Sequence, residues 1–151
     1  ESAEEMYRAV LSEYDRSDIA IMCAAVADYA PETVSDVKLK RTGEDRILRL
    51  RPNPDIAAEL GRRKRPGQCL VGFALETNDE EMNARLKMEK KNLDFIVLNS
   101  LRDAGAGFQC DTNKVTVIGK QGDPVEIPCK PKIEVAADIV DIIGRYVSED
   151  R

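Results

Sequence analysis

Apolar side chains repeat at helical spacing near both ends of the chain. Met6, Val10 and Tyr14 fall on one face and predict an amphipathic helix over residues 2–15. The same spacing predicts a C-terminal helix, whose apolar face comprises Val135, Ala136, Ile139, Val140, Ile143, Tyr146 and Val147. A further helix is expected over residues 80–91.

One more helix is indicated by its first residues. Asn53, Pro54 and Asp55 are typical of a helix start, with Asn53 as the N-cap, Pro54 in the first helical position and an acid in the first turn. We expect this helix to run to about Arg63.

Long apolar runs predict strands that are buried on both faces of a parallel sheet. These runs cover residues 18–27, 68–75 and 93–99. Residues 37–41 and 46–51 instead alternate apolar and charged side chains, which is typical of a β-hairpin with one solvated face.

A second hairpin is expected from residues 114–119 and 124–127. Strands that alternate with helices favour right-handed crossovers and an α/β fold. We therefore predict one domain over residues 1–151, Rossmann-like and three-layered, with a mostly parallel sheet and projecting β-hairpins. We also expect it to be incomplete at its N-terminus.

Composition excludes several kinds of chemistry. The chain has no histidine, so neither a Ser–His–Asp nor a Cys–His arrangement is possible. Its four cysteines show no CxxC spacing, which argues against a zinc site and suits a reducing cytoplasm. Cys23 and Cys69 lie in apolar runs and are interpreted as buried thiols. The net charge of −5 does not favour a nucleic-acid surface, and no apolar run is long enough to span a membrane.

Ligands of open α/β sheets bind beyond the carboxyl ends of the strands, which nominates the segments that begin at Asp28, Glu76 and Asn99. Small residues at 24–27 precede Asp28, so a ligand can approach the backbone there. Asp28 is a candidate for a ribose hydroxyl or a metal ion. The alternative is a small-residue strand packed under helices, with Asp28 only starting a loop.

Basic side chains offer candidate phosphate contacts. On a strand, Lys38 and Lys40 would share one face, although a charged face also protects an edge strand. Lys87 and Lys91 lie one helical turn apart and form a possible clamp for a polyphosphate, or simply a cationic helix end. The helix start at residues 53–56 offers N–H groups to an anion, or serves capping alone. Neither a Walker A sequence nor GxGxxG occurs in the chain.

Taken in order, these segments resemble a known family. They are Ala-Ala-Val-Ala-Asp-Tyr at 24–29, Lys-Leu-Lys at 38–40, Asn-Pro-Asp-Ile at 53–56, Val-Gly-Phe-Ala at 71–74 with Glu76 and Thr77, Lys87 and Lys91 with Asn92 and Asp94, then Gly107 and Phe108 with Asp111 and Asn113. The series is similar to the bacterial phosphopantothenate–cysteine ligases, which usually form the C-terminal half of a bifunctional decarboxylase/ligase of coenzyme A biosynthesis.

The resemblance implies a CTP-dependent ligation of 4'-phosphopantothenate with cysteine through an acyl-cytidylate, with Mg²⁺ accompanying CTP. It implies a cytoplasmic homodimer, joined to a flavin-dependent decarboxylase domain, with no flavin in this domain. Lys38 resembles a flap lysine with a catalytic role, and Asp28 is the candidate metal ligand. The residues implied in CTP binding are Ala25, Asp28, Lys38, Asn53, Pro54, Asp55, Ile56, Phe73, Lys87 and Lys91.

The chain departs from the family in one important segment. The family's glycine-rich N-terminal part, which helps to bind phosphates, is missing, so we expect residues 1–151 to be inactive alone. The alternative is a non-catalytic CTP-binding or dimerisation fragment of that enzyme. The flavin-dependent half is rejected because it uses a catalytic histidine, and a nicotinamide-dependent dehydrogenase is disfavoured by the absent GxGxxG.

Overall fold

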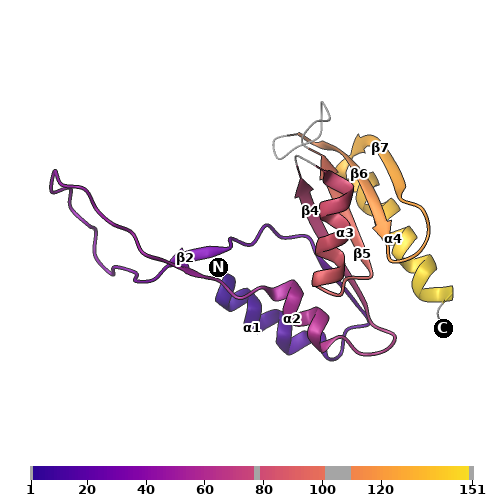
Figure 1. The fold of residues 1–151 in the computed structure, drawn as a ribbon, viewed down its shortest axis with the longest axis horizontal. Coiled ribbons are helices and arrows are strands. Elements are labelled where there is room, and N and C mark those ends of the chain that lie inside the picture. Colours follow the sequence, from indigo (N-terminus) through magenta and orange to yellow (C-terminus); the bar gives the residue numbers. More distant parts are fainter. Residues whose placement is uncertain (1, 77–78, 101–109, 150–151) are drawn as a thin grey trace.

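The computed structural model describes residues 2–76, 79–100 and 110–149 (Figure 1). Its helices are α1 (Ala3–Tyr14), α2 (Ile56–Arg63), α3 (Glu80–Lys90) and α4 (Lys132–Glu149). Its strands are β1 (Ile19–Met22), β2 (Tyr29–Pro31), β3 (Leu50–Pro52), β4 (Cys69–Glu76), β5 (Phe95–Ser100), β6 (Thr112–Gly119) and β7 (Val125–Pro131). In the described ranges, no helix is both long enough and apolar enough to cross a lipid bilayer.

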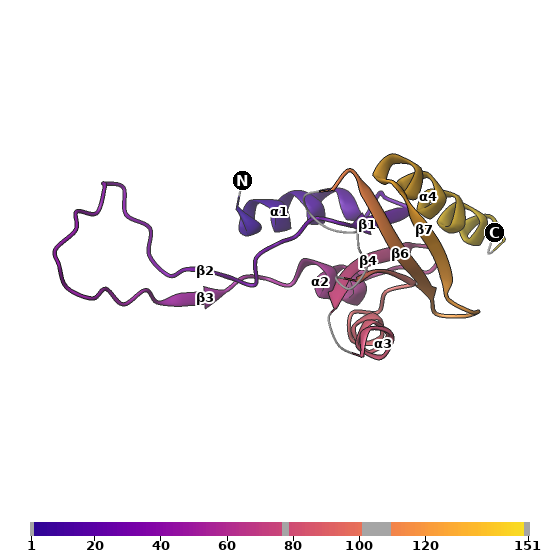
Figure 2. The same ribbon diagram turned by 90° about the horizontal axis from the view of Figure 1, so that it is seen from above.

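The main sheet has the strand order β1-β4-β5-β6-β7. Both β1 and β5 run parallel to β4, whereas β6 runs antiparallel to β5 and to β7. All strands of this sheet except β6 therefore point the same way, and the predicted α/β fold with a mostly parallel sheet is confirmed. Helices α3 and α4 lie on opposite sides of the sheet, which gives the expected three layers (Figure 2).

Each face of the sheet has its own apolar core. Alternate residues of β4 serve the two faces, because side chains along a strand point alternately up and down. Leu70 and Ala74 pack with residues of α1, α2 and α3, while Cys69 and Val71 pack with residues of α4. Cys69 is buried, as predicted. Helix α1 contributes to the first core as expected, with Tyr14 fully inside it.

The first strand is shorter and more exposed than predicted. Ile19 and Ile21 are each 39% exposed, and Cys23, predicted to be buried, is exposed beyond the end of β1. By register, Ile19 and Ile21 face the same side as Cys69 and Val71, which is the side that α4 covers. Helix α4 packs on β6 and β7, at the other end of the sheet, so the edge strand β1 stays uncovered on that face.

The predicted projecting hairpin exists, but its paired strands lie at its base. Residues 29–31 pair antiparallel with residues 50–52, and residues 32–49 between them form no regular strand. We call residues 29–52 the arm, which extends away from the rest of the molecule (Figures 1 and 2). The strands expected at 37–41 and 46–49 are thus wrong, and Lys38 and Lys40 share no strand face. An apolar–charged alternation cannot form a sheet where there is little core to pack on.

The second predicted hairpin is formed by β6 and β7, and it belongs to the main sheet rather than projecting from it. The C-terminal helix also differs in detail from its prediction. Val135, Ile139 and Ile143 are buried, whereas Ala136 and Val140 are exposed. The stripe that α4 presents to the sheet is therefore narrower than the apolar periodicity indicated.

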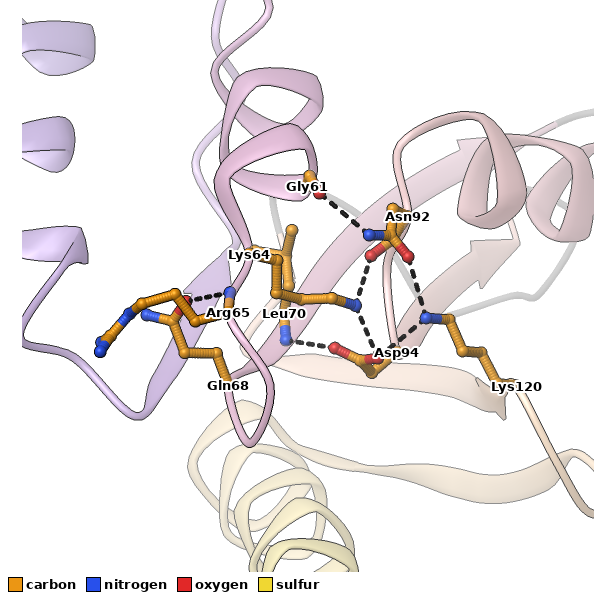
Figure 3. Close-up of polar contacts among 8 residues, drawn as sticks. All are labelled: Gly61, Lys64, Arg65, Gln68, Leu70, Asn92, Asp94 and Lys120. Atoms are coloured by element: carbon orange, nitrogen blue, oxygen red, sulfur yellow. Dashed lines mark hydrogen bonds and ion pairs between the residues drawn. The ribbon is translucent and has the colours of Figure 1, made fainter.

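A buried carboxylate joins three connections at the amino ends of the central strands (Figure 3). Asp94 accepts hydrogen bonds from Lys64 Nζ at 2.7 Å, from Lys120 Nζ at 3.0 Å and from the backbone N–H of Leu70 at 2.8 Å. Both lysines also donate to Asn92. The side chain of Lys64 is only 10% exposed. The cluster fastens the loops after α2 and α3 to the end of β6.

Candidate functional site

A pocket of about 260 Å³ opens between the end of β1, the start of α2 and one side of α3. Four separate parts of the chain form its walls. The lining residues are Met22, Ala24, Ala25, Val26, Ala27, Asp28, Asn53, Pro54, Asp55, Ile56, Ala57, Gly72, Phe73, Lys87, Lys91 and Leu93. The alanines at positions 24, 25 and 27 have small side chains, so a ligand in the pocket can approach the backbone there.

The pocket contains nine of the ten residues that the sequence nominated for nucleotide binding, namely Ala25, Asp28, Asn53, Pro54, Asp55, Ile56, Phe73, Lys87 and Lys91. The tenth, Lys38, is exposed on the arm and is not among the lining residues. Its role as a flap lysine therefore stays a prediction. The segments meet because parallel strands and their crossover helices bring residues far apart in sequence to one edge of the sheet.

The start of α2 differs from its prediction in a way that shapes the pocket. The N-cap is Asp55, whose Oδ1 accepts from the N–H of Ala58 at 3.0 Å, and the helix begins at Ile56. Asn53, expected to be the cap, holds the opposite wall instead. Its Nδ2 donates to the Ala27 carbonyl at 2.8 Å, and its backbone N–H donates to the Asp28 carbonyl at 2.8 Å.

Both pocket lysines are paired with carboxylates. Lys87 Nζ lies 2.9 Å from Oε1 of Glu76, the last residue of β4. Lys91 Nζ lies 2.9 Å from Oδ2 of Asp55 and 3.0 Å from its Oδ1. Burial raises the pKa of Asp55, but the hydrogen bonds from Lys91 and from the Ala58 N–H outweigh it, so this pKa lies below its ordinary value. The carboxylate stays ionised near neutral pH and keeps Lys91 at the pocket wall.

Helix α2 packs unusually close to the end of α3 because Gly61 has no side chain. A Cβ on Gly61 would lie 1.9 Å from the backbone oxygen of Lys91, far inside contact distance. The Nδ2 of Asn92 also donates to the Gly61 carbonyl at 2.9 Å (Figure 3). These contacts bring the helix that carries Asp55 against the turn that carries Lys91.

The other nominated residues fall outside the pocket. Asn113 Nδ2 donates to Asn99 Oδ1 at 2.8 Å, so the third nominated strand end is joined to the start of β6. Gly107 and Phe108 lie outside the described residues. Within the described ranges, no group of three or more histidine, cysteine, aspartate or glutamate side chains is placed to hold a metal ion. Asp28 lines the pocket, and its role as a metal ligand stays a prediction.

Sequence reasoning missed several pocket residues. Met22, Gly72 and Leu93 line the pocket although none carries a polar side chain. Gly72 had a detectable signal, since a glycine inside a strand often marks a close approach. A Cβ there would lie 2.6 Å from Leu93 Cδ1. The segment from Glu76 was nominated as a strand end, but the ion pair of Glu76 with Lys87 depends on how β4 and α3 pack.

Comparison with known proteins places the chain in a family. The family model described as the DNA/pantothenate metabolism flavoprotein C-terminal domain matches residues 1–146. The chain belongs to this family. A curated relative of the chain is the coenzyme A biosynthesis bifunctional protein CoaBC of Bacillus subtilis (strain 168), which is 48% identical over 144 residues, or 95% of this chain and 35% of that protein.

Another relative, from an unknown prokaryotic organism, is named cysteine/cysteine sulfinic acid decarboxylase. It is 53% identical over 139 residues, which cover 92% of this chain and 39% of that protein. The chain thus spans little more than a third of the curated relatives that it matches. Their names describe proteins much longer than the shared domain.

Solved structures agree with the family assignment. The crystal structure of the C-terminal domain of CoaBC superposes with a TM-score of 0.79 at 36% identity, covering 99% of this chain and 64% of that one. A complex of a Cab2 H337A mutant with phosphopantothenate-cysteine superposes with a TM-score of 0.68 at 15% identity, covering 97% of this chain and 52% of that one. At this low identity, the similarity to the Cab2 mutant shows a shared fold alone.

Proposed function

We propose that the chain is the CTP-binding part of a phosphopantothenate–cysteine ligase of coenzyme A biosynthesis. The observation that carries the proposal is the pocket, which gathers nine residues that the family resemblance assigns to CTP from four separate segments. Similarity to the C-terminal domain of CoaBC supports the same assignment. As a further part of this proposal, the resemblance supports a flavin-dependent decarboxylase domain in the same full-length protein.

The pocket offers two kinds of contact that suit a nucleoside triphosphate. The bare backbone at residues 24–27 and the ring of Phe73 suit a base and sugar, while Lys87 and Lys91 suit phosphates. Both ammonium groups are held at the pocket by carboxylates, that of Lys87 by Glu76 and that of Lys91 by Asp55. A site of this kind acts by orientation and charge stabilisation and requires no histidine.

The proposed reaction has two steps. A carboxylate oxygen of 4'-phosphopantothenate attacks the α-phosphorus of CTP, and the bond from that phosphorus to the bridging oxygen breaks, releasing pyrophosphate. The amine of cysteine then attacks the acyl carbon of the acyl-cytidylate, CMP leaves, and the nitrogen loses a proton. Lysines that neutralise the phosphates lower the barrier to the first step, because negative charge accumulates on the departing pyrophosphate.

Mg²⁺ fits this site as a companion of the triphosphate. Mg²⁺ in nucleotide sites is commonly held by one or two carboxylates together with substrate phosphates. Asp28 supplies one such carboxylate at the pocket wall. The metal would supply charge neutralisation of the phosphates, and the chain's own lysines would orient them.

Nucleotide selectivity tests the proposed function. Titration calorimetry with CTP, UTP, ATP and GTP, each with Mg²⁺, is expected to show clear preference for CTP, because the pocket is small and residues 24–27 present backbone groups to the base. Equal affinity for ATP and CTP would contradict a cytidine-specific site. Because residues 1–151 are expected to be inactive alone, pyrophosphate release on addition of 4'-phosphopantothenate is then measured with the family's glycine-rich segment added, which separates a ligase from a fragment that only binds CTP.

The arm supports a second part of the proposal, a homodimer. Large apolar side chains are exposed along it, and Ile47 reaches 89% exposure. The others are Tyr29, Val34, Val37, Leu39, Leu48 and Leu50. Apolar surface of this extent on a thin projection is typical of an interface. We propose that the arms of two copies pack on each other.

Removing one apolar side chain from the arm is expected to weaken that dimer. Ile47→Ser should lower the association constant by at least about tenfold, since burying an isoleucine contributes about 1.5–3 kcal/mol and the substitution removes one from each copy. Sedimentation velocity across a dilution series measures the change. Val140→Ser, on the exposed face of α4, is the matched control and should leave association unchanged. Equal behaviour of the two variants would place the interface elsewhere.

A further inference from the structure

Glu76 contacts the pocket lysine Lys87 from outside the pocket. Its Oε1 accepts from Lys87 Nζ at 2.9 Å, yet Glu76 is not among the residues that line the cavity. The side chain of Glu76 is 19% exposed and that of Lys87 is 37% exposed. The carboxylate is therefore the more buried partner, and it is fixed to the end of a central strand.

The second lysine has a different kind of partner. Asp55 lines the pocket itself and also caps α2, so its carboxylate shares space with any ligand and already serves the helix. Glu76, in contrast, does not line the pocket. It can therefore hold the ammonium group of Lys87 without occupying the volume that a ligand needs.

A lysine ammonium carries three N–H donors, and the hydrogen bond to Glu76 uses one of them. The other two donors can then bond to a ligand while the first keeps the side chain oriented. An unrestrained lysine loses much rotamer freedom when a ligand fixes it. A lysine that a carboxylate already holds loses less at the moment of binding.

We infer that Glu76 is a positioning residue, which orients the ammonium of Lys87 toward the phosphates of the bound nucleotide. This inference rests on the proposed function, because it assumes that Lys87 contacts the triphosphate. An opposing effect is the repulsion between the carboxylate and the phosphates. The two effects differ in sign, so the direction of the measured change decides between them.

The experiment compares Glu76→Ala, Glu76→Gln and Lys87→Ala with the unchanged chain, by calorimetry of Mg²⁺-CTP and CMP. Glu76→Ala should weaken CTP about three- to tenfold, because Lys87 must then be ordered by the ligand alone. Glu76→Gln keeps an acceptor oxygen and should lose less than Glu76→Ala. CMP lacks the β- and γ-phosphates, so its affinity should change little in either variant.

Two controls separate positioning from a general loss of charge or stability. Glu81→Ala removes a carboxylate of α3 that pairs with Arg85 on the exposed surface, and should leave CTP affinity unchanged. In the Lys87→Ala background, Glu76→Ala should have no further effect on CTP, because a residue that acts through Lys87 has nothing left to orient.

The outcomes distinguish this inference from the function on which it rests. Tighter CTP binding by Glu76→Ala or Glu76→Gln, an effect equal to that of Glu81→Ala, or a full effect that persists without Lys87 would each overturn the positioning role alone. Absence of CTP binding by the unchanged chain would overturn the proposed function and the positioning role together.

Discussion

Asp94→Asn is expected to lower the free energy of unfolding by about 3 kcal/mol, because it removes the only carboxylate that the described contacts give to the buried end of Lys64. The amide that replaces it would also present N–H donors among the donors of Lys64, Lys120 and the Leu70 backbone. Urea unfolding followed by circular dichroism measures the loss.

Asp138→Asn is the matched control for that measurement. Asp138 pairs with Lys130 between α4 and β7, and its side chain is 40% exposed. An exposed ion pair contributes at most about 1 kcal/mol. If Asp94→Asn costs no more than Asp138→Asn, the cluster at the amino ends of β4 and β5 does not stabilise the fold as we argue.

The same cluster predicts how stability depends on pH. Burial raises the pKa of Asp94, but the hydrogen bonds from Lys64, from the Leu70 N–H and from Lys120 outweigh it, and this pKa lies below its ordinary value. A carboxyl whose pKa is lower in the folded than in the unfolded state stabilises the fold at pH values above its unfolded pKa. This contribution should shrink as the pH falls below about 4, and Asp94→Asn should lack that part of the dependence.

The second large effect concerns the two pocket lysines. Lys87→Ala and Lys91→Ala are each expected to weaken CTP about tenfold or more, since a charge-assisted hydrogen bond contributes about 1.5–3 kcal/mol. CMP affinity should change much less, because CMP lacks the β- and γ-phosphates. Calorimetry with both nucleotides, alongside thermal unfolding, separates lost binding from lost folding.

Lys90→Ala serves as the control for both lysine variants. Lys90 belongs to the same helix, is exposed and does not line the pocket. Its removal changes the net charge equally and should leave CTP affinity nearly intact. If all three variants bind CTP alike, these lysines are ordinary surface charges and the triphosphate lies elsewhere.

Much of the fold could be predicted because local patterns specify local structure. The run at 68–75 predicted a buried strand, and β4 is that strand. The run at 18–27 has a similar composition, but it forms an edge strand of four residues. Hydrophobicity indicates that a segment packs against something, whereas its place in the sheet depends on which neighbours pair with it. That information is not local, so the exposure of Ile19 and Ile21 was missed.

The candidate site shows the same division. The sequence placed Lys87 and Lys91 one turn apart on a helix, and that spacing alone puts them on one face. Their partners Glu76 and Asp55 lie 11 and 36 positions away from them along the chain. Such pairs form only after β4, α2 and α3 have packed together. The choice of Asp55 over Asn53 as the cap is also a tertiary outcome, because Asn53 is engaged by the backbone of residues 27 and 28.

The close contact at Gly61 limits how far α2 and the end of α3 can move relative to each other. Because α2 already touches the Lys91 carbonyl, the two helices cannot move closer together. The hydrogen bond from Asn92 and the Lys91–Asp55 ion pair oppose their separation. The side of the pocket formed by α2 and the end of α3 is therefore expected to be rigid. For a ligand larger than this cavity to enter, the opposite wall has to move. That wall is formed by residues 24–28, which have no helical or strand structure and are held to Asn53 by two hydrogen bonds.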